Sequence, residues 1–253
     1  VRELGISDDV VELMAGRIER LDAPSKQALK LAACIGAQFH LHLLAQVTGR
    51  SPSEVMGHLK DAVNEGLVVL LGDAYKYLEL DKDSLGGGLL DAVLLRSVRY
   101  KFAHDRIQQA AYSLIPAEVR TTLHRQIGQI LLRETSPSQR EQRVFDIVNQ
   151  LNASIELVDG PEDREELARL NLTAGVRALR SAAYASASRY LGTGIDLLRE
   201  DCWETQYEMA LDLHTQAAEA SYLNMGFDEM DRLIGVIYEN ARSTLDRVQA
   251  AEV

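Results

Sequence analysis

The segment SPSEVMGHLKDAVNEGLVVLLGD, residues 51–73, carries the clearest structural signals in the chain. Ser51 and Glu54 have the spacing of a capping box, and the proline between them suits the first helical position. The apolar residues that follow recur at helical spacing up to Gly66, which is typical of a helix end. Residues 67–71 then form a strand-like apolar run before a Gly-Asp turn. We therefore predict a capped helix followed directly by a strand.

Three helices are predicted before this segment and two strands after it. Ser7 is expected to cap the first helix, a second starts after Pro24, and a short apolar helix covers residues 41–47. Residues 74–80 should complete a hairpin, and residues 98–102 alternate apolar and basic side chains as a third strand. Helix, short helix, capped helix and hairpin is the order of a winged helix. We expect a winged-helix subdomain with a small three-stranded wing in a mainly α-helical chain.

Between the predicted strands lies the glycine-rich sequence DKDSLGGGLLDAVLL, residues 81–95. A phosphate-binding loop needs a lysine and a hydroxyl residue after its glycines, and no GxxxxGK[ST] pattern occurs in the chain. We interpret the segment as a flexible insertion in the wing.

The second half of the chain indicates helical repeats. Small and aromatic residues recur with a spacing of 43 residues: Ala174, Gly175, Tyr184, Ala187 and Gly194 are followed by Ala217, Ala218, Phe227, Met230 and Ile237. Small residues on facing helices with an aromatic residue at the turn are typical of packed helix-turn-helix repeats. The spacing exceeds the 34 residues of a tetratricopeptide repeat. We predict an α-helical, tetratricopeptide-like repeat array.

The charge distribution changes near Pro116. Residues 1–115 contain 13 Lys and Arg against 15 Asp and Glu, whereas residues 116–253 contain 14 against 23, and every lysine lies in the first part. This shift places a domain boundary at Pro116, with a winged-helix subdomain at 1–115 and a repeat arm at 116–253. The acidic second part disfavours nucleic acid and anionic lipid as partners.

Other broad classes are excluded by composition. With 46% apolar and 26% charged residues, the chain is typical of a soluble globular protein. It lacks an apolar run long enough for a membrane span and a signal peptide at its start. Its two cysteines are far apart, which fits a reducing compartment, so we expect a cytoplasmic protein. The first residues suggest a piece of a longer protein.

No active site or metal site is recognised in the sequence. His40 and His42 could supply half of a metal site, but no further histidine or cysteine has suitable spacing, so surface positions are favoured. The acidic cluster 162–166 follows Pro161, where carboxylates favour a helix start more than a catalytic pair. No nucleophile elbow or catalytic triad pattern stands out. We predict a non-enzymatic chain without a cofactor of its own.

His104 and Asp105 form the candidate functional site. They lie where the strand at 98–102 is expected to turn into a helix, so a side chain there can point toward a neighbouring domain. The alternative is that either residue simply caps the helix. Spacing alone leaves both interpretations open.

Several phrases resemble a known family. VVELMAGRIERL, LKLAACIGAQF, YKFAHDRIQQAAYSLIP, RVFDIVNQLN and WETQYEMALDLHTQAAEASYL are similar to the region after the nucleotide-binding core of large bacterial predicted ATPases of the STAND class. Those multidomain signalling proteins often carry this module between a serine/threonine kinase domain and a GAF plus histidine-kinase region of two-component systems. The glycine-rich insertion and the missing ATPase core depart from the family.

The resemblance implies a nucleotide-sensing role for His104. In the wider class, an apolar-His-Asp motif in the winged helix contacts the diphosphate of ADP, and Ala103-His104-Asp105 is similar to it. The implied function is a regulatory and interaction segment that contacts an upstream ATPase core and binds other domains or proteins through its helical arm. ATP and ADP would bind the parent protein. The alternative is a DNA-binding winged-helix transcriptional regulator, although the predicted reading helix, residues 51–65, is net acidic and disfavours specific DNA binding.

Overall fold

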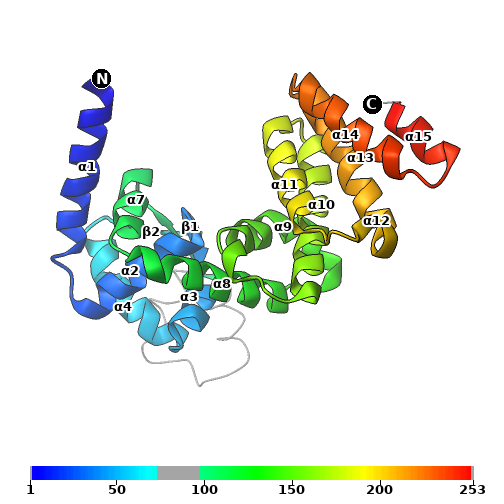
Figure 1. The fold of residues 1–253 in the computed structure, drawn as a ribbon. Helices are drawn as coiled ribbons and strands as arrows, with labels where there is room; N and C mark the ends of the chain where they lie inside the picture. The colour runs from blue at the N-terminus through cyan, green and yellow to red at the C-terminus, as the bar shows by residue number, and fades with distance from the viewer. Residues whose placement is uncertain (1, 73–96, 252–253) are drawn as a thin grey trace. The chain divides into compact units, whose positions relative to one another are not determined.

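The computed structural model describes residues 2–72 and 97–251 (Figure 1). The protein is mainly helical with a small three-stranded sheet. It divides into two compact units, Val1–Leu131 and Leu132–Val253, so the division falls later than the boundary predicted at Pro116. The predicted strand 74–80 and the insertion 81–95 lie outside the described residues.

The first unit combines helices with the sheet. In chain order its elements are α1 (Arg2–Ile18), α2 (Ala23–Ile35), β1 (Gln38–His40), α3 (Leu41–Thr48), α4 (Pro52–Asn64), β2 (Val68–Leu71), β3 (Arg99–Phe102), α7 (Asp105–Ser113) and the first part of α8 (Ala117–Glu134).

The sheet is antiparallel with the order β1-β3-β2, so β3 is its central strand. Phe39, Tyr100 and Phe102 are buried on the inner face, and the Phe39 ring stacks on Tyr100 with centroids 5.6 Å apart. The strand β1 was not predicted from the sequence. Its three residues are too few for an alternating pattern, and they become a strand only because β3 pairs with them.

The helix ends follow local chemistry. Ser51 and Glu54 form both hydrogen bonds of the predicted capping box at the start of α4. Asp22 caps α2 by accepting a hydrogen bond from the Ser25 N–H at 2.9 Å. The predicted cap at Ser7 is wrong, because α1 already begins at Arg2 and Ser7 lies inside the helix. The apolar pattern that follows Ser7 is continuous with helical turns before it, so the residue type alone misplaced the start.

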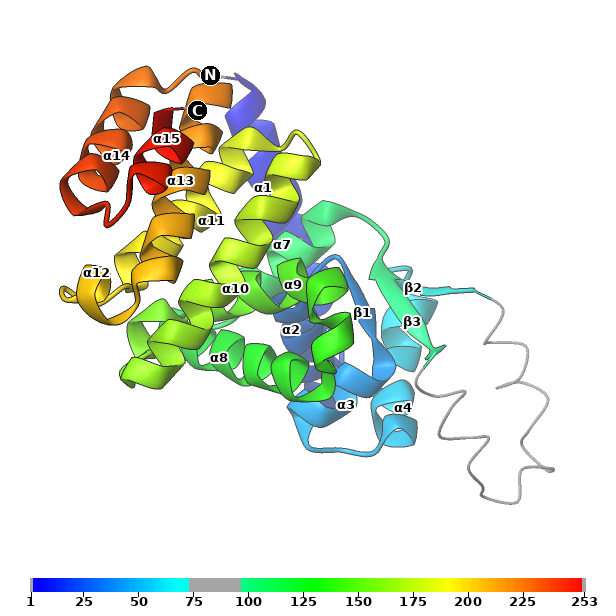
Figure 2. The same cartoon turned by 90° about the vertical axis from the view of Figure 1, so that its right-hand side faces the viewer.

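All regular secondary structure among the described residues of the second unit is helical (Figure 2). After the end of α8 it contains α9 (Pro137–Asn152), a 3-10 turn (Ile155–Leu157), α10 (Pro161–Arg180), α11 (Tyr184–Leu197), α12 (Cys202–Thr205), α13 (Tyr207–Leu223), α14 (Phe227–Asn240) and α15 (Thr244–Ala251).

Two helical hairpins repeat with the predicted spacing. The first is α10–α11 and the second is α13–α14, and α11 packs against α13. Each hairpin turn contains a residue in the left-handed region, Ala182 at φ 55° and Met225 at φ 61°, which are 43 positions apart. The same offset therefore relates backbone conformation as well as residue type.

Close helix contacts occur at the glycines of these hairpins. A Cβ added at Gly175 on α10 would lie 2.4 Å from Cγ of Leu191 on α11. One added at Gly194 would lie 2.6 Å from Cδ2 of Leu213 on α13. The predicted close packing of small residues is thus present at both positions.

Helices α8 and α9 each bury an apolar stripe. Ile127 and Ile130 on α8, and Val144 and Ile147 on α9, belong to the core. Val119, in the first turn of α8, is 45% exposed and lies outside this core.

Candidate functional site

His104 is the N-cap of α7. Its backbone is extended, at φ −151° and ψ 148°, and its Nδ1 accepts a hydrogen bond from the Arg106 N–H at 3.2 Å. The side chain is exposed. Asp105 is the first residue of α7 and is also exposed, so the cap is made by the histidine and not by the aspartate.

The cap determines which ring nitrogen of His104 carries the proton. An Nδ1 that accepts from the Arg106 N–H must be unprotonated, so the neutral ring holds its hydrogen on Nε2. Nε2 is then a hydrogen-bond donor. Capping and donation to an external oxygen are therefore compatible, and one imidazole can do both.

The helix that His104 caps is fixed along its length. Ile107, Ala110 and Ala111 of α7 are buried. At its last turn, the Tyr112 hydroxyl lies 2.9 Å from Nε2 of His124 on α8. Burial raises the pKa of the Tyr112 hydroxyl, which keeps it protonated in this hydrogen bond. The position of His104 is thus set by a well-packed element.

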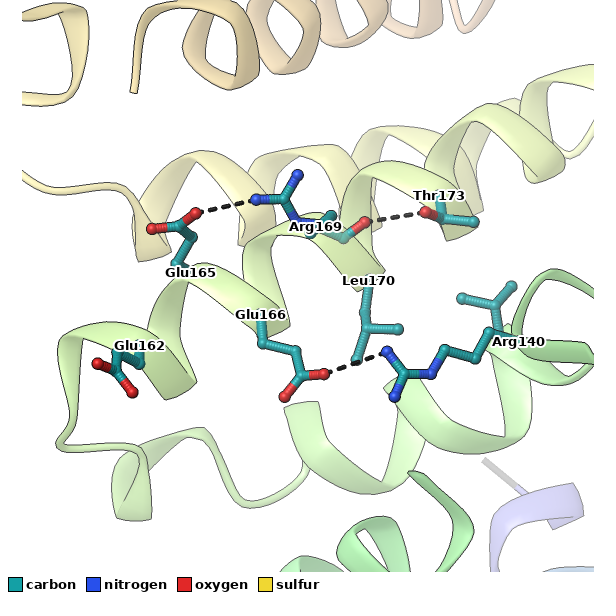
Figure 3. A pocket seen from close by; sticks show the side chains of 8 residues that line it. Arg140, Glu162, Glu165, Glu166, Arg169, Leu170 and Thr173 are labelled. Carbon is teal, nitrogen blue, oxygen red and sulfur yellow. Dashed lines mark hydrogen bonds and ion pairs between the residues drawn. The ribbon is translucent and has the colours of Figure 1, made fainter. Parts of the chain in front are cut away.

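A second candidate site is a cleft of about 420 Å³ in the second unit. Figure 3 shows its lining from α9 and α10: Arg140, Val144, Glu162, Glu165, Glu166, Arg169, Leu170 and Thr173. Val144 and Leu170 are buried apolar residues of this lining, and the charged side chains surround them.

Ion pairs cross and border this cleft. Arg140 of α9 lies 3.4 Å from a carboxylate oxygen of Glu166, and Arg169 lies 2.9 Å from Glu165 (Figure 3). The second oxygen of Glu165 accepts from the Gln206 side chain at 2.9 Å. Glu162 has no such partner among the described residues. Three of the four carboxylates in the acidic cluster 162–166 therefore line a concave surface.

The other residues singled out from the sequence do not meet in one site. Within residues 2–72 and 97–251, no three His, Cys, Asp or Glu side chains lie close enough to hold a metal ion. Both cysteines are buried, and burial raises the pKa of the Cys34 thiol to about 11. A thiol with this pKa is a poor nucleophile at neutral pH.

The cleft was missed by sequence analysis. Arg140 and Glu166 are 26 positions apart and on different helices, so no local pattern relates them.

The described part of the chain contains no helix with the length and apolar character of a membrane span.

The comparisons with known proteins give one weak match among curated proteins. The chain is 25% identical over 279 aligned residues to a protein of Dictyostelium discoideum named hybrid signal transduction histidine kinase G. The alignment covers 96% of this chain and 8% of that protein, so the chain corresponds to a small part of its relative. No protein-family model matches the chain, and no solved structure matches it significantly.

Proposed function

We propose that this chain is a non-catalytic regulatory and interaction segment of a larger signal-transduction ATPase of the STAND type. In this proposal it couples the nucleotide state of an upstream ATPase core to a protein-binding helical arm. The observation that carries the proposal is His104, an exposed histidine that caps a packed helix and keeps an Nε2 donor for an external acceptor.

The topology of the first unit supports a winged helix. Its order α2-β1-α3-α4-β2-β3, with β3 between the other two strands, is the order expected of that fold. His104 follows β3 directly. A phosphate oxygen of ADP in the core would accept from Nε2, which stabilises the closed, ADP-bound state, and exchange for ATP would shift the population toward the open state.

The second unit supports a protein-binding role. Repeated hairpins such as α10–α11 and α13–α14 bury one face of each helix and leave extended surfaces for partners. The cleft between α9 and α10 is one such surface, with an apolar floor and a Glu162 carboxylate that has no partner among the described residues. Its composition favours a basic or apolar partner segment.

The relative supports a role in signalling. It is named a signal transduction histidine kinase, and the aligned part is one segment of a much longer protein. Association with kinase domains and a cytoplasmic location belong to the same proposal.

The alternative, a DNA-binding regulator, has less support. The helix that would enter the groove is α4, which carries Lys60 against Glu54 and Asp61. Arg50 lies 4.0 Å from Glu54, so part of this negative charge is neutralised, but the helix gains no positive excess. Duplex recognition depends on Lys and Arg contacts to phosphates.

The test uses the intact parent protein with two substitutions at one position. His104→Ala removes both the cap and the Nε2 donor, whereas His104→Asn keeps a good cap and removes the imidazole donor. Both should accelerate ADP dissociation about tenfold to a hundredfold, which corresponds to the loss of a hydrogen bond to a charged group.

The two variants separate the two roles of His104. Only His104→Ala should also lower the melting temperature, since asparagine restores the cap. Asp105→Asn tests whether the carboxylate of the other residue in the candidate site also contributes to ADP binding. Unchanged ADP dissociation in both His104 variants would refute the sensor role and leave capping as the function of this residue.

A further inference from the structure

The outward face of the three-stranded sheet carries two basic side chains on its central strand. Arg99 and Lys101 of β3 are both exposed, while Tyr100 between them points into the core. The register places His40 and Leu71 on either side of Arg99, and Gln38 and Val69 on either side of Lys101. None of these six outward positions is a carboxylate.

Neither basic side chain is paired within the described residues. Arg99 and Lys101 make no ion pair or side-chain hydrogen bond there, whereas Arg17, Arg140 and Arg232 each lie within 4 Å of a carboxylate. Residues two apart on a strand face the same side and lie about 7 Å apart. Their like charges therefore repel each other, and no carboxylate among the described residues compensates them.

Protection of a sheet edge does not explain these charges. Lysine on an outer strand discourages pairing with another chain, but β3 is the central strand and both of its edges are already paired. The flanking positions differ in character, with Gln38 and His40 on one side and the half-buried Val69 and Leu71 on the other.

We propose that this outward sheet face binds an extended acidic segment of a partner protein. Carboxylates at every second residue of an extended chain would match the spacing of Arg99 and Lys101. Apolar side chains of the same segment would lie against Val69 and Leu71. This surface belongs to the first unit and requires no nucleotide, so it adds a contact beyond the proposed function.

Charge distribution favours an acidic peptide over nucleic acid as the partner. Duplex DNA carries a charge about every 1.7 Å of its axis, so a chain of net charge −11 repels it more strongly than it repels a short acidic peptide. A short acidic segment has few charges and can be matched locally by two cations. The experiment therefore compares binding of the acidic peptide with binding of a DNA duplex.

The experiment measures binding of a fluorescein-labelled peptide of alternating glutamate and valine to the 253-residue chain at low ionic strength. The double variant Arg99→Gln, Lys101→Gln should weaken binding about fivefold to tenfold, as expected for two exposed ion pairs. The swapped variant Arg99→Lys, Lys101→Arg should keep the affinity. Lys60→Gln on α4 is the matched control and should have no effect.

Two further measurements make the result unambiguous. Thermal unfolding of each variant should match the parent, since exposed positions on the sheet carry little of the stability. A peptide with glutamine in place of glutamate should not bind. The proposal is refuted if the double variant and the Lys60 control bind the peptide equally, or if a DNA duplex binds more tightly than the peptide through the same two residues.

Discussion

Substituting Gly175 by alanine tests the contact that joins α10 to α11. The new Cβ would lie 2.4 Å from Cγ and 2.6 Å from Cδ2 of Leu191. Ordinary contacts between carbon atoms are about 3.5–4.0 Å, so the helices must separate by about 1 Å or Leu191 must leave its position. Leu191 is fully buried, and Cγ is the branch point of its side chain, so neither adjustment is easy.

The net effect of Gly175→Ala follows from two opposing contributions. Overpacking costs about 1–3 kcal/mol, and the upper end applies because a branch atom is blocked. Replacing glycine by alanine inside a helix returns about 1 kcal/mol. We therefore expect a loss of about 2 kcal/mol in the free energy of unfolding, which lowers the melting temperature by about 4–8 °C.

Gly192 provides a matched control on α11. A Cβ at this position meets no atom within 4 Å, so Gly192→Ala should stabilise the protein by up to about 1 kcal/mol. Both variants are measured by guanidinium unfolding monitored by circular dichroism. A stability of Gly175→Ala equal to or above that of the parent would contradict the close packing of the hairpin. The double variant Gly175→Ala, Leu191→Ala should lose less than the sum of the single losses, because the added methyl group fills part of the cavity.

Three other outcomes are expected from the structure. His214 is buried beside Trp203, with ring centroids 5.0 Å apart, and burial lowers its pKa below the usual 6.5. The unfolded chain therefore binds a proton at His214 at a higher pH than the folded chain does, so the free energy of unfolding should fall as the pH drops below about 6.5. His214→Gln should flatten this pH dependence in unfolding titrations. Tyr207→Phe removes a hydroxyl that donates to Asp246 and accepts from the Arg242 N–H at 2.8 Å; hydrogen exchange in α15 should accelerate, and unchanged exchange would argue against this anchor. The isolated chain should show no measurable ADP affinity by calorimetry, because the proposed phosphate site needs an ATPase core, and micromolar binding would overturn that requirement.

Local sequence determined where α4 begins. The capping box at Ser51 and Glu54 forms because both hydrogen bonds lie within one turn, so no distant residue is needed. The repeat of 43 residues was also visible, since Gly175 and its counterpart Ala218 recur with their neighbours at equal spacing. Ser7 is the exception, because a residue that favours a cap can also lie inside a helix when earlier residues continue it.

The candidate site was only partly determined by sequence. The strand-to-helix position of His104 followed from the change in periodicity, and both capping and sensing remained open. Only the structure shows that Nδ1 accepts from Arg106 and that the neutral ring keeps its hydrogen on Nε2. The tautomer depends on the direction in which the ring points, which is a side-chain torsion and leaves no pattern in the sequence.

The remaining features were decided by contacts between distant residues. β1 exists because β3 pairs with Gln38–His40 across a long stretch of chain, and the cleft exists because Arg140 of α9 meets Glu166 of α10. Periodicity identifies which face of an element is apolar, but it does not identify which other element covers that face. Pairing and cleft geometry are therefore set by the tertiary structure, where packing brings together residues that have no relation along the chain.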